Sequence, residues 1–287
     1  MKNKANVRHF FVHLILLAGV GIMVFPFIWM VLTSFKSVGE AMQIPPTIFP
    51  KQFLTDAYSQ IVTALPFARV YLNTIISTVV TTVVQVSFCS MAAYGFARID
   101  FPFKNIIFVI ILSVLMVPGQ IFLIPQYLII QKMGLLDTIP ALFIPNLFSA
   151  FGTFLLRQFF RGVPDELEES AYIDGSGTIK TFISIILPLS VPMLITVFLF
   201  SFSWQWTDID YTGMFFTSTK TKLLPNIVGI PQSLSLKAED FAAGKNLYEA
   251  AIRNTCGLMI IAPLVVVYVF CQKFLVQGIE RSGLTAD

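Results

Sequence analysis

The chain has 287 residues, of which 56% are hydrophobic and only 12% are charged, and its mean hydropathy is +0.78. Soluble domains carry about 25% charged residues, so this composition excludes an ordinary soluble protein and predicts an integral membrane protein. The formal net charge of +3 is small and no basic run occurs, so we expect no nucleic-acid partner.

Six apolar runs are long enough to cross a hydrocarbon core of about 30 Å, which takes roughly 20 helical residues. They cover about 10–32, 70–96, 105–130, 138–156, 181–204 and 254–271. No run alternates like a strand of a membrane barrel, so the predicted fold class is an all-α integral membrane protein with six transmembrane helices. The first run could be a secretory signal, but Pro26, Trp29 and the lack of a small-x-small cleavage site favour a retained helix.

The distribution of Lys and Arg predicts the orientation. Segments 1–9, 98–104, 157–180 and 273–287 hold ten Lys and Arg in 55 residues, whereas 33–69, 131–137 and 205–253 hold nine in 93. The denser set is expected in the cytoplasm, which places both termini there. The predicted order is a cytoplasmic N-terminus 1–9, a transmembrane domain 10–276 and a cytoplasmic tail 277–287. Within the domain, loop 161–180 is expected in the cytoplasm and loop 206–250 outside it.

Amide side chains interrupt the apolar runs, among them Gln85, Gln120, Gln126 and Asn146. An unpaired amide is costly in a membrane and tends to face the interior of a bundle. These side chains either hydrogen-bond between helices or line a translocation path. Pro118, Gly119 and Pro125 break the third run, as in the discontinuous helices of transporters, although ordinary kinks are an alternative.

The segment 164–174, PDELEESAYID, is acidic at five of its eleven positions. Asp165 as N-cap, with Glu168 three residues later, predicts the start of a helix that ends near 172–173. Asp174 to Gly177 predict a turn with Gly175 in the left-handed conformation. A second helix is expected to begin near 178 and to continue straight into the membrane. The acidic helix either is a solvated connection or docks into a groove on a partner.

Other chemistry is not indicated by the sequence. Cys89, Cys256 and Cys271 have no metal-ligand spacing and are expected to be small apolar fillers. The chain has no phosphate-binding loop, no H-E-x-x-H and no G-x-S-x-G motif. We therefore expect a non-catalytic chain without a cofactor or metal of its own, and any ATP-driven work is expected in another chain.

Residues 169–188, ESAYIDGSGTIKTFISIILP, resemble the signature E-A-A-x-x-x-G-x9-I-x-L-P of membrane subunits of binding-protein-dependent ABC importers, with Ser170 in place of the first Ala. FPFIWMVLTSFKS at 25–37, YLNTIISTVV at 71–80, AAYGFAR at 92–98, VPGQIFLIPQY at 117–127 and QKFLVQGI at 272–279 are similar to MalG-type carbohydrate permeases. The resemblance spans nearly the whole chain. It departs at 205–215, QWTDIDYTGMF, from the family pattern W-N-D-F-x-x-P. This chain has Thr207 where the pattern has Asn, and it lacks the Pro that follows in the pattern. The family's substrate-side details are therefore not carried over to 206–250.

This resemblance implies a type I ABC importer permease fold in which the helix within 164–177 is a coupling helix that docks on a separate ATPase. In that case Glu169 contacts the ATPase, Ala171 permits close approach and Gly175 makes the turn. The positions carried over from the signature are Glu169, Ser170, Ala171, Asp174, Gly175, Leu187 and Pro188. Asp165, Glu166 and Glu168 are expected mainly to start the helix.

The implied assembly is a carbohydrate importer in a prokaryotic cell membrane. Its other parts are a second permease, two ATP-binding subunits that hold ATP and Mg, and an extracytoplasmic sugar-binding protein. Candidates for the translocation path are Gln120, Gln126, Asn146, Trp206 and Tyr211. Trp204, Trp206 and Tyr211 either stack on a sugar or anchor the chain at the membrane interface. The segment 235–254 is expected to form an amphipathic helix outside the membrane.

Two alternatives remain. The coupling signature is shared widely, so the solute of such an importer could be something other than a sugar. A stand-alone secondary transporter would need charged residues near the middle of its spans, and none is found there.

Overall fold

The computed structural model describes residues 2–41, 43–64, 66–216, 223–227 and 248–283, and those residues form helices and turns without strands. The chain divides into two compact units. The first unit contains 1–68 and 227–262, and the second contains 69–226 and 263–287.

The first unit is built on α1 (Lys2–Ser34), α2 (Val38–Ala41), α3 (Asp56–Ala64) and the first part of α15 (Tyr248–Gly283). A small apolar core joins α3 to α15 and contains Ala57, Ile61, Ala251, Ile252 and Cys256. The connection between α2 and α3 is held by Glu40, whose carboxylate accepts hydrogen bonds from Thr47 Oγ1 at 2.8 Å and from the Lys51 N–H at 2.9 Å.

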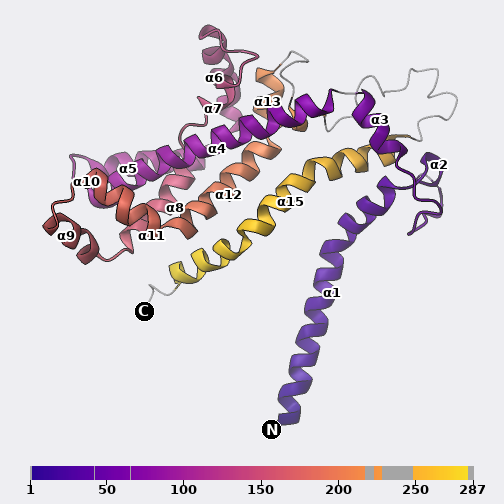
Figure 1. The fold of residues 1–287 in the computed structure, drawn as a ribbon, viewed down its shortest axis with the longest axis horizontal. Helices are drawn as coiled ribbons and strands as arrows, with labels where there is room; N and C mark the ends of the chain where they lie inside the picture. The colour runs from indigo at the N-terminus through magenta and orange to yellow at the C-terminus, as the bar shows by residue number, and fades with distance from the viewer. Residues whose placement is uncertain (1, 42, 65, 217–222, 228–247, 284–287) are drawn as a thin grey trace. The chain divides into compact units, whose positions relative to one another are not determined.

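The second unit starts from α4 (Phe67–Arg98), which is 32 residues long. The elements that follow are α5 (Lys104–Ser113), η1 (Val114–Met116), α6 (Gln120–Lys132), α7 (Pro140–Phe143), α8 (Ala150–Arg161), α9 (Asp165–Ile173), α10 (Thr178–Thr181), η2 (Phe182–Ile186), α11 (Leu187–Leu189), α12 (Val191–Thr207), α13 (Asp210–Phe215) and η3 (Leu224–Ile227). In Figure 1, α4, α8 and α12 run side by side, and α9, α10 and α11 gather at one end of them.

The main core of the second unit lies between α4, α8, η2 and α12. Its buried members are Cys89, Ala93, Tyr94, Leu156, Phe160, Val163, Phe182, Ile186, Met193 and Val197. Gly152 lets α8 come close to its neighbours, because a Cβ there would lie 3.0 Å from Val197 Cγ1 and 3.4 Å from Cys89 Sγ. A second apolar cluster joins α6, α7 and α13 through Ile130, Ala141, Leu142, Phe215, Phe216 and Leu223.

The expected spans are only partly continuous helices. By length and composition, Phe11–Ser34, Phe67–Arg98 and Ala251–Leu275 can each cross a membrane. Two bent pairs of helices add one candidate span each, so the described residues provide three to five spans. The predicted span 138–156 is not one helix: α7 ends at Phe143, and α8 has only 12 residues, or about 18 Å. Pro145 lies between these two helices and cannot donate a helical hydrogen bond.

The prolines and glycine of the third run behave differently from one another. Lys104–Met116 and Gln120–Lys132 meet at 106°, so the chain bends at Pro118 and Gly119, as expected. Pro125 lies inside α6 without ending it. Most of the expected helix at 235–254 lies outside the described residues, which resume at Tyr248 as the start of α15.

Candidate coupling helix and polar cavity

The acidic segment forms α9, which begins at Asp165 and ends at Ile173, close to the predicted bounds. Its start differs from the prediction. Pro164 takes the N-cap position and no side chain caps the helix, so Asp165 is not the N-cap and no capping box forms with Glu168. The first turn is stabilised instead by the favourable placement of three carboxylates near the positive end of the helix dipole: Asp165, Glu166 and Glu168.

The turn after α9 confirms the predicted role of Gly175, whose φ is +79°. The Ser176 N–H donates to the Ala171 carbonyl at 2.9 Å, and the Gly175 N–H donates to the Tyr172 carbonyl at 3.0 Å. This pair of bonds is a Schellman motif, which satisfies the last carbonyl groups of a helix. Nothing lies within 4 Å of a Cβ built on Gly175, so the need for glycine here is conformational.

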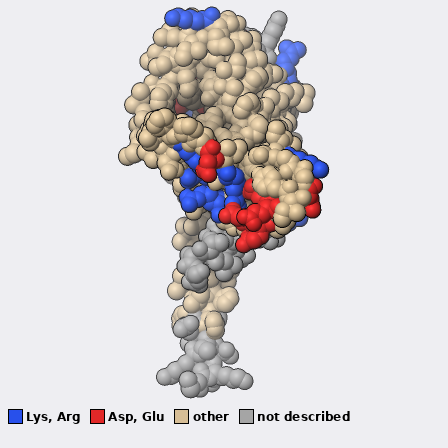
Figure 2. All heavy atoms as spheres, turned by 90° about the vertical axis from the view of Figure 1, so that its left-hand side faces the viewer, with Lys and Arg blue, Asp and Glu red and all other residues tan. Residues whose placement is uncertain are grey.

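The two faces of α9 differ. Glu169 and Ser170 are exposed, as is Asp174 after the helix, whereas Glu168 and Ala171 are buried at 7% and 6%. Ala171 thus lies on the face of α9 that is buried against its own chain, and its predicted part in a close approach to an ATPase stays a prediction. Around the exposed acids, three apolar side chains are also exposed: Leu167, Tyr172 and Ile173. Figure 2 shows the acidic side chains gathered on this end of the molecule, with Lys and Arg beside them.

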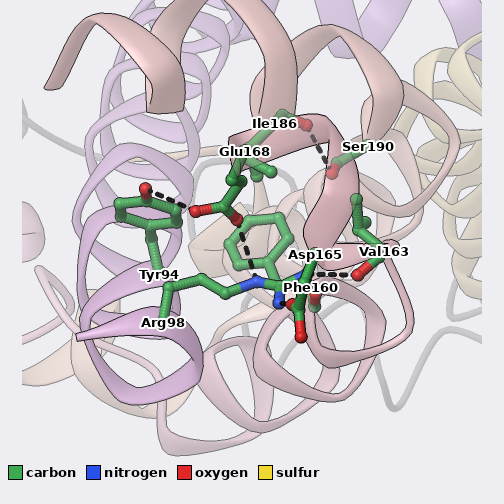
Figure 3. Close-up of polar contacts among 8 residues, drawn as sticks. All are labelled: Tyr94, Arg98, Phe160, Val163, Asp165, Glu168, Ile186 and Ser190. Atoms are coloured by element: carbon green, nitrogen blue, oxygen red, sulfur yellow. Dashed lines mark hydrogen bonds and ion pairs between the residues drawn. The ribbon is translucent and has the colours of Figure 1, made fainter. Parts of the chain in front are cut away.

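Arg98, the last residue of α4, contacts the buried face of α9 (Figure 3). Its Nε lies 2.9 Å from Glu168 Oε1 and forms an ion pair with it, and its Nη1 pairs with Asp165. Tyr94, one helical turn earlier on α4, donates from its hydroxyl to Glu168 Oε2 at 3.2 Å. The guanidinium Nη2 donates to the Phe160 carbonyl at 2.8 Å and to the Val163 carbonyl. One side chain thus joins α4, the end of α8 and α9.

The signature continues through α10, the π-helix η2 and α11, where Leu187 is half-buried and Pro188 is exposed. The chain does not run straight into the membrane, because Thr178–Leu189 and Val191–Thr207 meet at 79°. Pro188 removes a helical N–H, and the hydroxyl of Ser190 at the bend donates to the Ile186 carbonyl at 2.6 Å. These local features explain why the predicted single helix is bent.

A separate polar cavity of about 340 Å³ lies within the second unit. Its lining residues are Gln85, Asn146, Phe148, Ser149, Trp204, Gln205, Asp208 and Tyr211. Gln85 Nε2 donates to the backbone carbonyl of Asn146 at 2.7 Å, and Asn146 Nδ2 donates to the Leu142 carbonyl at 2.8 Å. The Gln85 amide therefore joins α4 to the segment around Asn146, the Asn146 amide makes a local bond, and both residues also line the cavity.

Asp208 is the titratable group of this cavity that the sequence reasoning missed. It follows the last residue of α12. Burial raises the pKa of Asp208 to about 6, against the lowering effect of the Tyr211 N–H, which donates to Asp208 Oδ1 at 3.2 Å. The nearby carboxylate of Asp210 raises the pKa further. Asp208 therefore exchanges its proton at a mildly acidic pH.

The structure brings together Asn146 and Tyr211 of the five predicted path residues, and Trp204 joins them. Trp206 is only 1% exposed and its ring stacks on Phe202 at 5.6 Å, so it is not available to a solute in this conformation. Gln120 is exposed at the start of α6 and Gln126 is partly buried in the same helix. Neither of these two glutamines lines the polar cavity.

Residues 85–281 match the family described as the inner membrane component of binding-protein-dependent transport systems. The chain belongs to this family of permeases. The permease is 30% identical over 263 residues to the polygalacturonan/rhamnogalacturonan transport system permease protein YtcP of Bacillus subtilis, which covers 90% of this chain and 91% of the relative. It is also 30% identical over 278 residues to the sn-glycerol-3-phosphate transport system permease protein UgpE of Yersinia pestis. The aligned region covers 95% of this chain and 96% of the relative.

The fold of the permease is similar to that of a bacterial ABC transporter involved in the import of the acidic polysaccharide alginate. The TM-score is 0.79, with 23% identity, and the match covers 93% of this chain and 97% of the other. The expected class, an all-helical ABC importer permease fold, is confirmed by this likeness and by the family match. The permease is accordingly an inner membrane component of an ABC transporter.

The residues that hold α9 were not identified from the sequence of the permease. Arg98 and Glu168 are 70 positions apart, and no local pattern joins them. One signal was available in AAYGFAR at 92–98. Tyr94 and Arg98 are four residues apart, so they share one face of a helix and can reach a common partner.

Proposed function

We propose that this permease forms half of the translocation path of an ATP-driven carbohydrate importer and that α9 is its contact with a separate ATPase. The observation that carries this proposal is the structure of α9. This short helix is attached to α4 by an ion pair on its buried face, and its exposed face carries acidic and apolar side chains. A partner with a groove of basic and apolar residues would complement that face.

The assembly that follows has a second, similar permease, two ATP-binding subunits and an extracytoplasmic binding protein. ATP and Mg are bound by the ATPase, and closure of its two copies moves the permeases between inward- and outward-facing states. With the N-terminus in the cytoplasm, α9 lies on the cytoplasmic side and loop 206–250 faces the binding protein.

The carbohydrate assignment is supported by the polar cavity and by the relative that is named for the transport of polygalacturonan and rhamnogalacturonan. Trp204 supplies an aromatic face, and Gln205 and Asp208 supply polar groups that can hydrogen-bond hydroxyls. Among the residues that the structure describes, those lining the cavity include a carboxylate but no Lys or Arg. A neutral saccharide is therefore favoured over a uronate or a phosphate ester at this site.

The substrate is tested by purifying the complex from its native membrane through a tag on this chain and measuring ATP hydrolysis in liposomes. The binding protein is supplied loaded with a neutral oligosaccharide, a uronate oligosaccharide or glycerol 3-phosphate. We expect co-purification of an ATPase and a second permease, and stimulation by the neutral oligosaccharide. Stimulation by glycerol 3-phosphate alone would contradict the carbohydrate assignment.

The ATPase contact is tested by Glu169→Lys in the same complex. We expect transport to be lost while the permease still inserts into the membrane, because a charged contact is reversed. Asp100→Lys is the matched control, since Asp100 is exposed, lies outside α9 and gives the same change in net charge. Normal transport by Glu169→Lys would show that this glutamate does not couple the two subunits.

A further inference from the structure

The covalent connection between α9 and α12 contains several points of flexure. The turn at Gly175 comes first, then the π-helix η2, and then the 79° bend beside Ser190. Turns and helix bends are the positions where backbone dihedral angles absorb a displacement. Movement of α9 is therefore not passed on rigidly along the chain.

The connection from α9 to α4 is of a different kind. Arg98 and Glu168 have side chains that are only 12% and 9% exposed, and their ion pair is supported by the Tyr94 hydroxyl. The Asp165 side chain is 75% exposed, so its ion pair with Arg98 adds little to the attachment of α9 to α4. A buried pair with additional hydrogen bonds has one favoured geometry, because every other arrangement leaves a buried charge without a partner.

The helix that receives this connection reaches the polar cavity. Gln85 lies in α4 thirteen positions before Arg98, which is a distance of about 20 Å along an α-helix. Gln85 lines the cavity and donates to the Asn146 carbonyl at 2.7 Å. One continuous helix therefore joins the site behind α9 to the cavity.

We propose that Arg98 is a positioning residue that couples α9 to α4, so that displacement of α9 by the ATPase reaches the polar cavity through α4. This inference rests on the proposed function of α9 as the contact with the ATPase. The requirement is for arginine rather than for a positive charge alone. The planar guanidinium donates hydrogen bonds to the Asp165 carboxylate and to the Phe160 and Val163 carbonyls. Its Nε is ion-paired with Glu168 without a hydrogen bond to Oε1, and a lysine ammonium cannot reproduce that fork.

The test uses the complete importer in liposomes and measures the number of solute molecules transported per ATP hydrolysed. Arg98→Gln and Arg98→Lys are expected to lower this ratio by about tenfold, while the ATPase still co-purifies with the permease. Glu168→Gln is expected to lower it in the same direction, and the double variant Arg98→Gln/Glu168→Gln is expected to be no worse than Arg98→Gln, since both changes break one interaction. Lys104→Gln, which breaks the exposed pair with Asp100, is the control and should leave the ratio unchanged.

A merely structural role for Arg98 would reduce the yield of the complex but leave the ratio at the wild-type value in the complex that forms, and that result would overturn the proposal. Additive losses in the double variant would overturn it as well. If Arg98→Gln prevents assembly, Glu168→Gln decides the question by the same ratio. The Glu169→Lys variant separates the two proposals. If Glu169→Lys uncouples and the Arg98 variants do not, only the positioning role fails. If Glu169→Lys and the Arg98 variants all transport normally, α9 does not couple the permease to the ATPase and both proposals fail.

Discussion

Gly175→Val perturbs the turn after α9 without a collision at the added Cβ. The φ of Gly175 is +79°, and nothing lies within 4 Å of an added Cβ. A residue other than glycine pays about 1–2 kcal/mol for a left-handed conformation, and a β-branched side chain is expected near the upper value. About 2 kcal/mol changes a conformational equilibrium by roughly 30-fold. The native turn, which includes the Schellman motif that ends α9, should therefore lose most of its free-energy advantage over other turn conformations.

The assay is transport per ATP hydrolysed by the complete importer in liposomes, because it reports the position of α9 and not only the amount of complex. Gly177→Val is the matched control. Gly177 belongs to the same turn, has open space around it and has a φ of −83°, which valine adopts without strain. Gly175→Asn should fall between the two, since asparagine tolerates the left-handed region better than valine.

We expect a lower ratio of transport to ATP hydrolysis for Gly175→Val and a wild-type ratio for Gly177→Val. Equal behaviour of the two variants would refute this expectation. If both are normal, the left-handed turn does not position α9 for coupling. If both are defective, added bulk in the turn matters and the sign of φ does not.

Three further outcomes are expected. Gly152→Val should lower the melting temperature of the solubilised permease by forcing α8 away from Val197, at a cost of about 1–3 kcal/mol, whereas Gly95→Val, with open space around Gly95, should lower it less. The proton on Asp208 is held more tightly in the folded chain, because its pKa is about 6 rather than 3.8, so its stabilising contribution is complete below about pH 4 and is lost as the pH rises through 6. Asp208→Asn should therefore flatten the pH dependence of the melting temperature between about pH 4 and 7, and an unchanged slope would contradict the assignment. Trp204→Ala should raise the solute concentration needed for half-maximal transport without changing ATPase binding, and an unchanged value would remove Trp204 from the path.

The bounds of α9 and the turn after it were predictable because their causes are local. A run of acidic residues, a glycine after the last helical position and a new polar start near 178 all lie within fifteen residues of one another. The bend between Leu189 and Val191 was not predicted, although Pro188, Ser190 and Pro192 stand at that point. Hydropathy is insensitive to such breaks, since it counts apolar side chains and ignores backbone hydrogen bonds. The predicted fourth span, 138–156, is likewise not one helix, because Pro145 interrupts the backbone hydrogen bonds between α7 and α8.

The polar cavity was predicted only in part. Asn146 was selected as an amide side chain within an apolar run and Tyr211 as an aromatic ring able to stack on a sugar, and the structure places both at the cavity. It could not separate Trp204 from Trp206, which differ by two positions. Two residues on a helix differ by about 200° in direction, so one ring faces the cavity and the other is packed against Phe202. The choice between them depends on which face α12 buries, and that face is set by its neighbours in space.

The adjacent residues Glu168 and Glu169 show how one acidic segment divides its roles. They have the same side chain and nearly the same position in the helix dipole, so sequence reasoning assigned Glu168 to helix initiation along with its neighbours. A step of about 100° around α9 places Glu168 against Arg98 and leaves Glu169 outside. The buried pair on the inner face gives the exposed carboxylate on the outer face a firm support, because a charged contact transmits force only if the helix that carries it cannot roll. Reversing the charge on the outer face therefore changes the contact with a partner, whereas neutralising the inner face changes the attachment of α9 itself.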